Sequence, residues 1–286
     1  MDRSAAQGPV MSGVVDTHTH VACAADRSPD APAVDASDWW RSGGSIDELL
    51  GDLDTAGVER AVVVQAVGAY GYDCSCAAAS VVARRDRTAL VVAVDMNDDP
   101  ARDLTALLDD PPSGATVAGV RAFGVGSVDA SWLTDGRGAA LWELAAARRL
   151  VVVPCILGDR FGDLRKLVER TPGVVIAVDH CGFGDLCVGD ADDNLAQLVD
   201  LPNVHLKVTS YVLEAAEAAD GDAAPTLERL VERFGAQRLC WGSDHPQDRR
   251  HDYVGKLALA AHAARSVDDA SRNALFATTG RRLFFD

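Results

Sequence analysis

Two histidines separated by one residue, near the amino terminus, are the strongest chemical signal in the sequence. They end a short segment, Val14 to His20, which begins apolar and finishes Asp-Thr-His-Thr-His. Because side chains alternate along a strand, Asp16, His18 and His20 would share one face, with the two imidazoles about 7 Å apart. Buried histidines need polar partners. This spacing favours two ligands for one metal ion, or a grip on one substrate, over two isolated structural histidines.

Polar residues also follow other apolar segments along the chain. They are Gln65, Asp95, Arg121, His180, Lys207, Thr209 and Asp244. The segment 150–156 is an exception, because Val-Val-Val-Pro-Cys offers no hard metal ligand. If these segments are parallel strands of one sheet, their polar ends meet at one edge.

The elements that must position these residues alternate regularly. Apolar segments predict strands at 14–20, 61–66, 89–94, 118–123, 150–156, 174–179, 204–208 and 239–242. Helical spacing predicts helices near 46–56, 77–85, from 100 onwards, 138–149, 161–170, 194–200, 226–234 and after 244. Eight such units without a linker predict an α/β protein with a single (β/α)8 TIM barrel over residues 13–286, after a loose tail at 1–12. A doubly wound open sheet is the alternative, although its dinucleotide fingerprint is incomplete in both Gly-x-Gly pairs.

A closed barrel makes the first and eighth strands neighbours, so His18, His20 and Asp244 would converge. Two imidazoles and a carboxylate suit Zn²⁺ or a similar divalent ion. Asp244 would accept a proton from water, and His180 would stabilise an oxyanion or protonate a leaving group. Arg121 would bind a substrate anion or pair with a core carboxylate.

Two further residues have a site role or a structural role on the sequence alone. Lys207 lies in an alternating strand, where it is either a substrate ligand or a paired lysine inside the barrel. Tyr70 either lines a pocket for a flat or cyclic substrate or packs the loops together.

Composition limits the partners. The chain has 286 residues, 48% of them hydrophobic, and a net charge of −16, which argues against nucleic acid and anionic membranes. We expect a small-molecule substrate, anionic or cyclic, and the sequence leaves room for a homo-oligomer. No signal peptide or membrane span is recognisable, and seven cysteines without paired spacing predict reduced thiols and a cytoplasmic location. Cys74 and Cys76 remain a weaker candidate for a metal site or a disulfide.

Several motifs together resemble the amidohydrolase superfamily. They are Asp-Thr-His-Thr-His at 16–20, Val-Asp-His-Cys-Gly at 178–182, Asn-Val-His-Leu-Lys at 203–207 and Trp-Gly-Ser-Asp-His-Pro at 241–246. They are most similar to the amidohydrolase-2 branch, with its 2-pyrone-4,6-dicarboxylate lactonase and sugar-lactonase members. Gln65 with Tyr70-Gly71-Tyr72-Asp73 is similar to a substrate-binding stretch of the pyrone lactonases, and Gly119-Val120-Arg121 to their strand-four arginine.

The resemblance implies a barrel hydrolase that opens a lactone or a related cyclic ester or amide. Asp244 would activate water, while His18 and His20 hold one divalent ion, zinc in the first place or manganese, or polarise the carbonyl without metal. The second arginine of the pyrone lactonases is missing at 124–127, which argues against a dicarboxylate substrate. Two alternatives stay open: a non-oxidative decarboxylase on the same barrel, and a barrel that binds a small molecule without chemistry.

Overall fold

Eight parallel strands form one sheet in the computed structural model, which describes residues 13–23, 44–126, 128–184, 194–247 and 250–286. Each strand pairs with the next in the chain. The strands are β1 (Val15–Thr19), β2 (Arg60–Val64), β3 (Thr88–Val94), β4 (Val117–Gly124), β5 (Val151–Ile156), β6 (Val175–Val178), β7 (Val204–Thr209) and β8 (Leu239–Gly242). All eight overlap the predicted strands.

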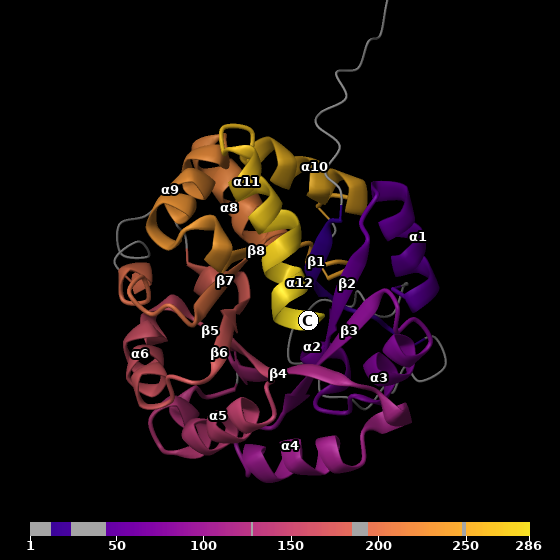
Figure 1. Ribbon diagram of the computed structural model, residues 1–286, viewed down its shortest axis with the longest axis vertical. Helices are drawn as coiled ribbons and strands as arrows, with labels where there is room; N and C mark the ends of the chain where they lie inside the picture. Colours follow the sequence, from indigo (N-terminus) through magenta and orange to yellow (C-terminus); the bar gives the residue numbers. More distant parts are fainter. Residues whose placement is uncertain (1–12, 24–43, 127, 185–193, 248–249) are drawn as a thin grey trace, which may run out of the picture.

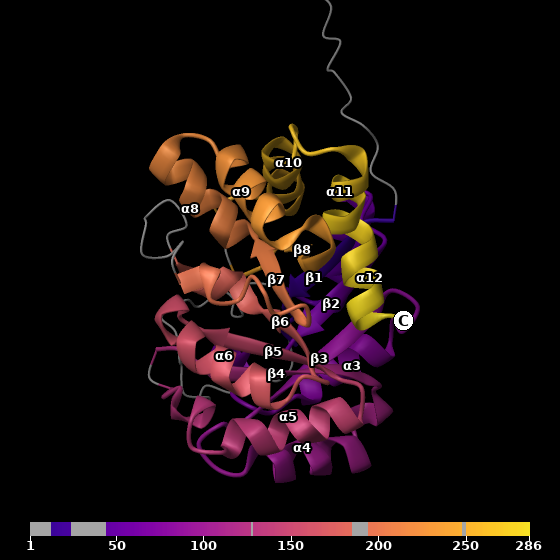
Figure 2. The same cartoon turned by 60° about the vertical axis from the view of Figure 1, so that its left-hand side comes forward.

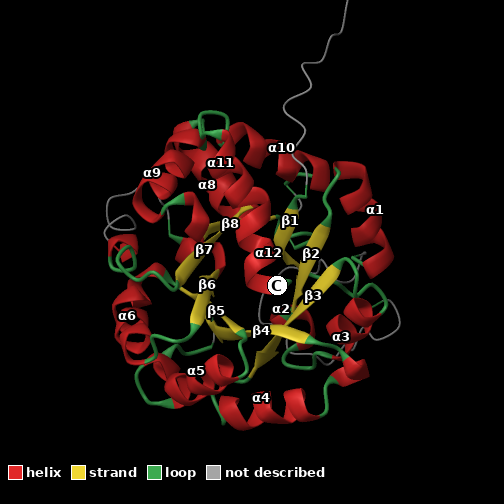
Figure 3. Ribbon diagram, viewed as in Figure 1, coloured by secondary structure: helices red, strands yellow, loops and turns green. Residues whose placement is uncertain are grey.

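Hydrogen bonds between the first and last strands close this sheet into a barrel. Asp244 N donates to His18 O at 2.9 Å, and His20 N donates to His245 O at 2.7 Å. Figure 3 shows the resulting ring of strands inside a ring of helices. The single (β/α)8 barrel is therefore confirmed, and the open sheet is excluded.

The outer helices bury their apolar faces against the strands. They are α1 (Ile46–Ala56), α2 (Val67–Tyr70), α3 (Ser75–Val82), α4 (Pro100–Asp109), α5 (Arg137–Ala147), α6 (Phe161–Arg170), α8 (Ser210–Asp220), α9 (Ala224–Phe234), α10 (Tyr253–Ala263) and α11 (Asp269–Asn273). The predicted capping box at the start of α1 is present, with Glu48 N donating to Ser45 Oγ and Ser45 N to the Glu48 carboxylate. None of the described helices combines the length and apolarity needed to cross a membrane.

The carboxy-terminal helix α12 (Thr279–Phe284) covers the amino-terminal end of the barrel (Figures 1 and 2). Phe284 joins a buried cluster of inward-facing strand residues that includes Val62, Val91 and Val153. This apolar plug fills the barrel at the end opposite to the polar strand ends.

Some predicted elements differ from the structure. The sequence did not predict α2 or α8, and residues 197–200 form turns where a helix was expected. The predicted tail at 1–12 lies outside the described residues.

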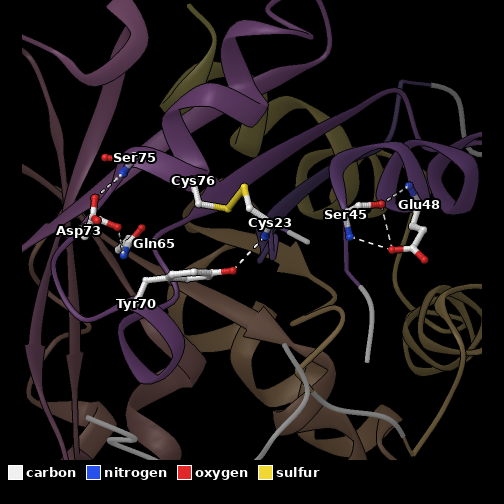
Figure 4. The surroundings of a disulfide bond; sticks show 8 residues. All are labelled: Cys23, Ser45, Glu48, Gln65, Tyr70, Asp73, Ser75 and Cys76. Atoms are coloured by element: carbon white, nitrogen blue, oxygen red, sulfur yellow. Dashed lines mark hydrogen bonds between the residues drawn. A yellow bond between two sulfur atoms is a disulfide. The ribbon is translucent and has the colours of Figure 1, made fainter. Parts of the chain in front are cut away.

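The prediction of reduced thiols is wrong for two cysteines. Cys23, just after β1, forms a disulfide with Cys76 in α3 (Figure 4). The weaker candidate, Cys74 with Cys76, therefore pairs differently, because the fold brings the end of β1 beside α3. Cys74 itself is a free buried thiol, as are Cys155, Cys181 and Cys240.

Candidate active site

Three side chains from β1 and from the end of β8 converge at the carboxyl end of the barrel. His18 Nε2 lies 3.3 Å from His20 Nε2, and Asp244 Oδ1 lies 3.5 and 3.4 Å from these two atoms. Ligands at about 2.0–2.1 Å in a zinc tetrahedron are about 3.3 Å from one another. The triangle of donor atoms thus has the size of one face of a zinc site.

The second nitrogen of each imidazole fixes its tautomer. His20 Nδ1 donates to Val64 O at 2.8 Å, and His18 Nδ1 lies 3.0 Å from Asp179 Oδ1. Both Nε2 atoms are therefore left as lone-pair donors that face Asp244, which is the arrangement of metal-ligating histidines. Burial lowers the pKa of His18 well below its usual value, so this ring is neutral and able to coordinate.

The donor set therefore fits a divalent cation. Asp244 Oδ1 is buried, and no described residue gives it a well-formed hydrogen bond, the nearest groups being the two imidazoles. Burial alone would raise the pKa of Asp244, but His180, His20 and His18 outweigh burial and lower it, so the carboxylate is ionised. A buried carboxylate aimed at two lone pairs is stabilised by a cation between them.

The turn that presents Asp244 is held from behind. Asp244 has a φ of 54°, a left-handed conformation that is uncommon for residues other than glycine. Lys256 of α10 is fully buried, and its Nζ donates to Ser243 O at 3.1 Å and to Asp244 O at 3.4 Å. These bonds stabilise the turn and aim Asp244 at the two histidines.

Asp16 turns away from the cluster instead of sharing the face of His18 and His20. Its carboxylate accepts hydrogen bonds from Ser243 N at 2.9 Å and from Tyr253 Oη at 2.8 Å. The pairing of β1 with β2 shifts between Asp16 and Thr19, which breaks the simple alternation expected from the sequence. Asp16 thus ties β1 to β8 and to α10.

A second group of charges lies directly behind His18. Asp179, at the end of β6, is fully buried and contacts Arg121 Nε at 2.8 Å and Lys207 Nζ at 3.1 Å, in addition to His18. Burial alone would raise the pKa of Asp179, but Lys207, His18 and Arg121 hold it well below its usual value. Asp179 is therefore an ionised carboxylate shared among three nitrogen groups.

His180 faces an open cavity next to this network. Its Nδ1 shares a 2.8 Å hydrogen bond with Thr209 Oγ1, so its Nε2 is the nitrogen left for other partners. The cavity has a volume of about 240 Å³ and is also lined by Arg121 and Asp244. The structure thus brings three of the predicted site residues onto one cavity, beside the histidine pair.

The remaining predicted residues lie behind this cavity or beside it. Lys207 is fully buried, 3.4 Å from His18 Nδ1 and beside Asp179, as the alternative of a paired interior lysine describes. Gln65 Nε2 donates to Gly71 O and Asp73 O, at 2.9 Å each. Tyr70 Oη accepts from Cys23 N at 2.9 Å, next to the disulfide (Figure 4). In the described part of the chain, Gln65 and Tyr70 shape the loops around the site.

The sequence reasoning missed Asp179, Lys256 and Cys155 as parts of the site. Cys155 of β5 lines the cavity, 3.3 Å from Arg121 Nη2. Asp179 directly precedes His180 at a strand end, which was an available signal. Lys256 carried none, because a lysine within a helix is usually exposed.

Comparisons with known proteins agree with this geometry. A model of an amidohydrolase family matches residues 15–285. An L-fucono-1,5-lactonase from Burkholderia ambifaria is 27% identical over 252 residues, which cover 84% of this chain and 83% of that protein. An amidohydrolase from Burkholderia multivorans with bound HEPES has a TM-score of 0.77 at 21% identity, covering 95% of this chain and 99% of its own, and another crystal form of it contains zinc. A probable 2-pyrone-4,6-dicarboxylic acid hydrolase from Acinetobacter baumannii has a TM-score of 0.76 at 17% identity, with coverage of 95% and 99%.

Proposed function

We propose, from the premise that this chain belongs to the amidohydrolase family, that it hydrolyses a lactone or a related cyclic ester or amide. The observation that carries the proposal is the convergence of His18, His20 and Asp244 beside a cavity that His180 and Arg121 also line. The curated lactonase relative supports hydrolysis of a lactone ring in particular.

In this reaction Asp244 takes a proton from water while the water oxygen bonds to the carbonyl carbon. Negative charge develops on the carbonyl oxygen, where the Nε2 side of His180 and the guanidinium of Arg121 can stabilise it. The bond from the carbonyl carbon to the ring oxygen then breaks. The leaving alkoxide takes the proton back from Asp244, and the product is an open-chain hydroxy acid.

We propose that His18, His20 and Asp244 hold one divalent cation, with zinc in the first place and manganese in the second. Such an ion lowers the pKa of water toward about 7 and polarises a carbonyl. Asp179 keeps His18 oriented for this role, and Val64 does the same for His20.

Replacing Asp244 with Asn tests the reaction. An amide cannot take up the proton from water, so we expect hydrolysis to fall by at least about 10³-fold, judged against losses of about 10⁴-fold when a triad carboxylate is replaced. Lactone hydrolysis is followed by proton release. Asp95→Asn changes another carboxylate at a strand end and should leave the rate near the wild type. An Asp244→Asn variant that is fully active would refute the assignment.

Metal content tests the histidine pair. Elemental analysis of protein purified with added zinc or manganese should find close to one equivalent, which His20→Ala removes because two ligands hold the ion weakly. His262→Ala, at an exposed histidine, should keep it. Wild-type protein that binds neither ion would leave the histidines to polarise the carbonyl directly.

The same experiments separate the two alternatives. A decarboxylase would release carbon dioxide from an unsaturated or aromatic acid, without proton release from lactones. A binding protein would bind lactones without turnover, and its affinity would not depend on the proton-accepting oxygen of Asp244.

A further inference from the structure

The cavity beside the catalytic groups has two chemically different sides. The polar side carries the residues that act on the carbonyl, namely Arg121, His180 and Asp244. The described residues of the other side include Val67, Phe123, Val125, Phe183 and Tyr211. A ring that presents its carbonyl to Asp244 must therefore lay its remaining atoms against apolar and aromatic groups.

This apolar side is one packed unit. Val67 and Phe123 belong to a buried cluster with Cys155, against which Val125 and Phe183 pack. The Phe183 ring lies 4.5 Å from the His180 ring and 5.6 Å from the Tyr211 ring, measured between centroids. A wall built from residues that support one another keeps its shape when a ligand binds.

The polar groups nearest to this wall already have partners in the described part of the chain. Arg121 gives its Nε to Asp179 and directs Nη2 to the Cys155 thiol, while His180 Nδ1 is bonded to Thr209. Ring hydroxyls placed on the wall would lose water without gaining matching hydrogen bonds. An apolar pocket disfavours an added hydroxyl by up to about 100-fold.

We infer that the substrate is a hydrophobic lactone, with alkyl or aryl groups on the ring carbons away from the carbonyl, rather than a polyhydroxylated sugar lactone. This inference rests on the proposed lactonase function and narrows it. It also separates this chain from its curated relative, whose named substrate, L-fucono-1,5-lactone, carries three ring hydroxyls.

A matched pair of substrates tests the inference. δ-Hexalactone and L-fucono-1,5-lactone share a six-membered lactone ring with one methyl group and differ in the three hydroxyls. We expect kcat/KM to be at least about 100-fold higher for δ-hexalactone. Equal values, or a preference for the sugar lactone, with both activities lost in Asp244→Asn, would overturn the inference and leave the lactonase function standing.

A variant of the wall adds a second test. Val125→Thr keeps the shape of the side chain and adds one hydroxyl at a half-buried position of the cavity. We expect the preference for δ-hexalactone to shrink several-fold, because a substrate hydroxyl gains a partner. Val125→Ile, the control, should keep the preference, and a preference that is the same in both variants would contradict the role of the wall.

Binding decides the inference even if neither lactone is hydrolysed, an outcome that would refute the proposed function. The lactams that correspond to the two lactones are titrated into the Asp244→Asn variant, and their Kd values are compared. Binding at least about 100-fold tighter for the methyl lactam supports a site for hydrophobic rings. Equal or reversed affinities overturn it.

Discussion

Asp179 is the residue on which the site network depends. It lies on the barrel axis side of β6, and its two carboxylate oxygens contact His18, Arg121 and Lys207. It fixes the tautomer of a candidate metal ligand and balances two buried cations. The same carboxylate thus connects coordination, anion binding and stability.

Replacing Asp179 with Asn should destabilise the protein strongly. Arg121 and Lys207 would be left as buried cations without a carboxylate, which typically costs about 3–5 kcal/mol in the free energy of unfolding. Urea denaturation measures the change. Lys207→Met in the Asp179→Asn background should recover part of the loss, because one of the two cations is removed. A loss below about 1 kcal/mol in the single variant would show that Asp179 is not needed to balance them.

The sequence identified the residues that end strands, and it missed those that act through other residues. His18, His20, His180 and Asp244 follow apolar segments, so their convergence follows from the parallel barrel alone. The partners of Asp179 come from three other strands, and their contacts depend on side-chain directions. No spacing in the sequence encodes such a network.

At the scale of elements, strands were easier to predict than helices. Strands buried on both faces appear as apolar runs, and each of the eight was located within two residues at either end. The helix α8 reads Ser-Tyr-Val-Leu-Glu-Ala-Ala-Glu-Ala-Ala-Asp, whose alanines blur the contrast between its two faces. The Cys23–Cys76 disulfide joins residues 53 apart, a pairing that only the assembled barrel creates.

The contact between β1 and β8 depends on Gly242. A methyl group at this position would lie 2.7 Å from His18 Cβ, closer than two carbon atoms can approach. Gly242→Ala should therefore push the strands apart, cost about 1–3 kcal/mol in stability and lower both activity and metal content.

Gly51→Ala is the matched control for Gly242→Ala, measured by thermal unfolding and by hydrolysis rate. Gly51 is an exposed glycine within α1, with no atom within 4 Å of an added methyl group, so alanine should be neutral or stabilising there. Wild-type activity in Gly242→Ala would show that the site tolerates a wider gap between β1 and β8.

At the scale of the whole molecule, His205 links the barrel to its carboxy-terminal helix. His205 Nδ1 donates to Ile176 O at 3.2 Å, and its Nε2 accepts from Arg282 of α12 at 3.2 Å. Burial, together with the charge of Arg282, lowers the pKa of His205 from 6.5 to about 4. The fold therefore favours the neutral ring.

The protein should lose stability as the pH falls from about 6.5 to about 4, because the unfolded chain binds a proton at His205 that the folded chain refuses. Above that window the contribution is complete, and its size is at most about 3 kcal/mol. His205→Gln should reduce the slope of unfolding free energy against pH in this window. His262→Gln, at an exposed histidine, should not. Identical slopes in all three proteins would contradict the assignment.

The plug of the barrel also sets an order for biosynthesis. Phe284 fills the interior beside Val62, Val91 and Val153, yet it follows β8 by about 40 residues. At about 5–20 residues per second, a ribosome adds it some 2–8 s after the last strand. The nascent chain therefore carries all eight strands for several seconds before their inner apolar surface has its cover, and during that interval the unfinished barrel is a natural client for chaperones.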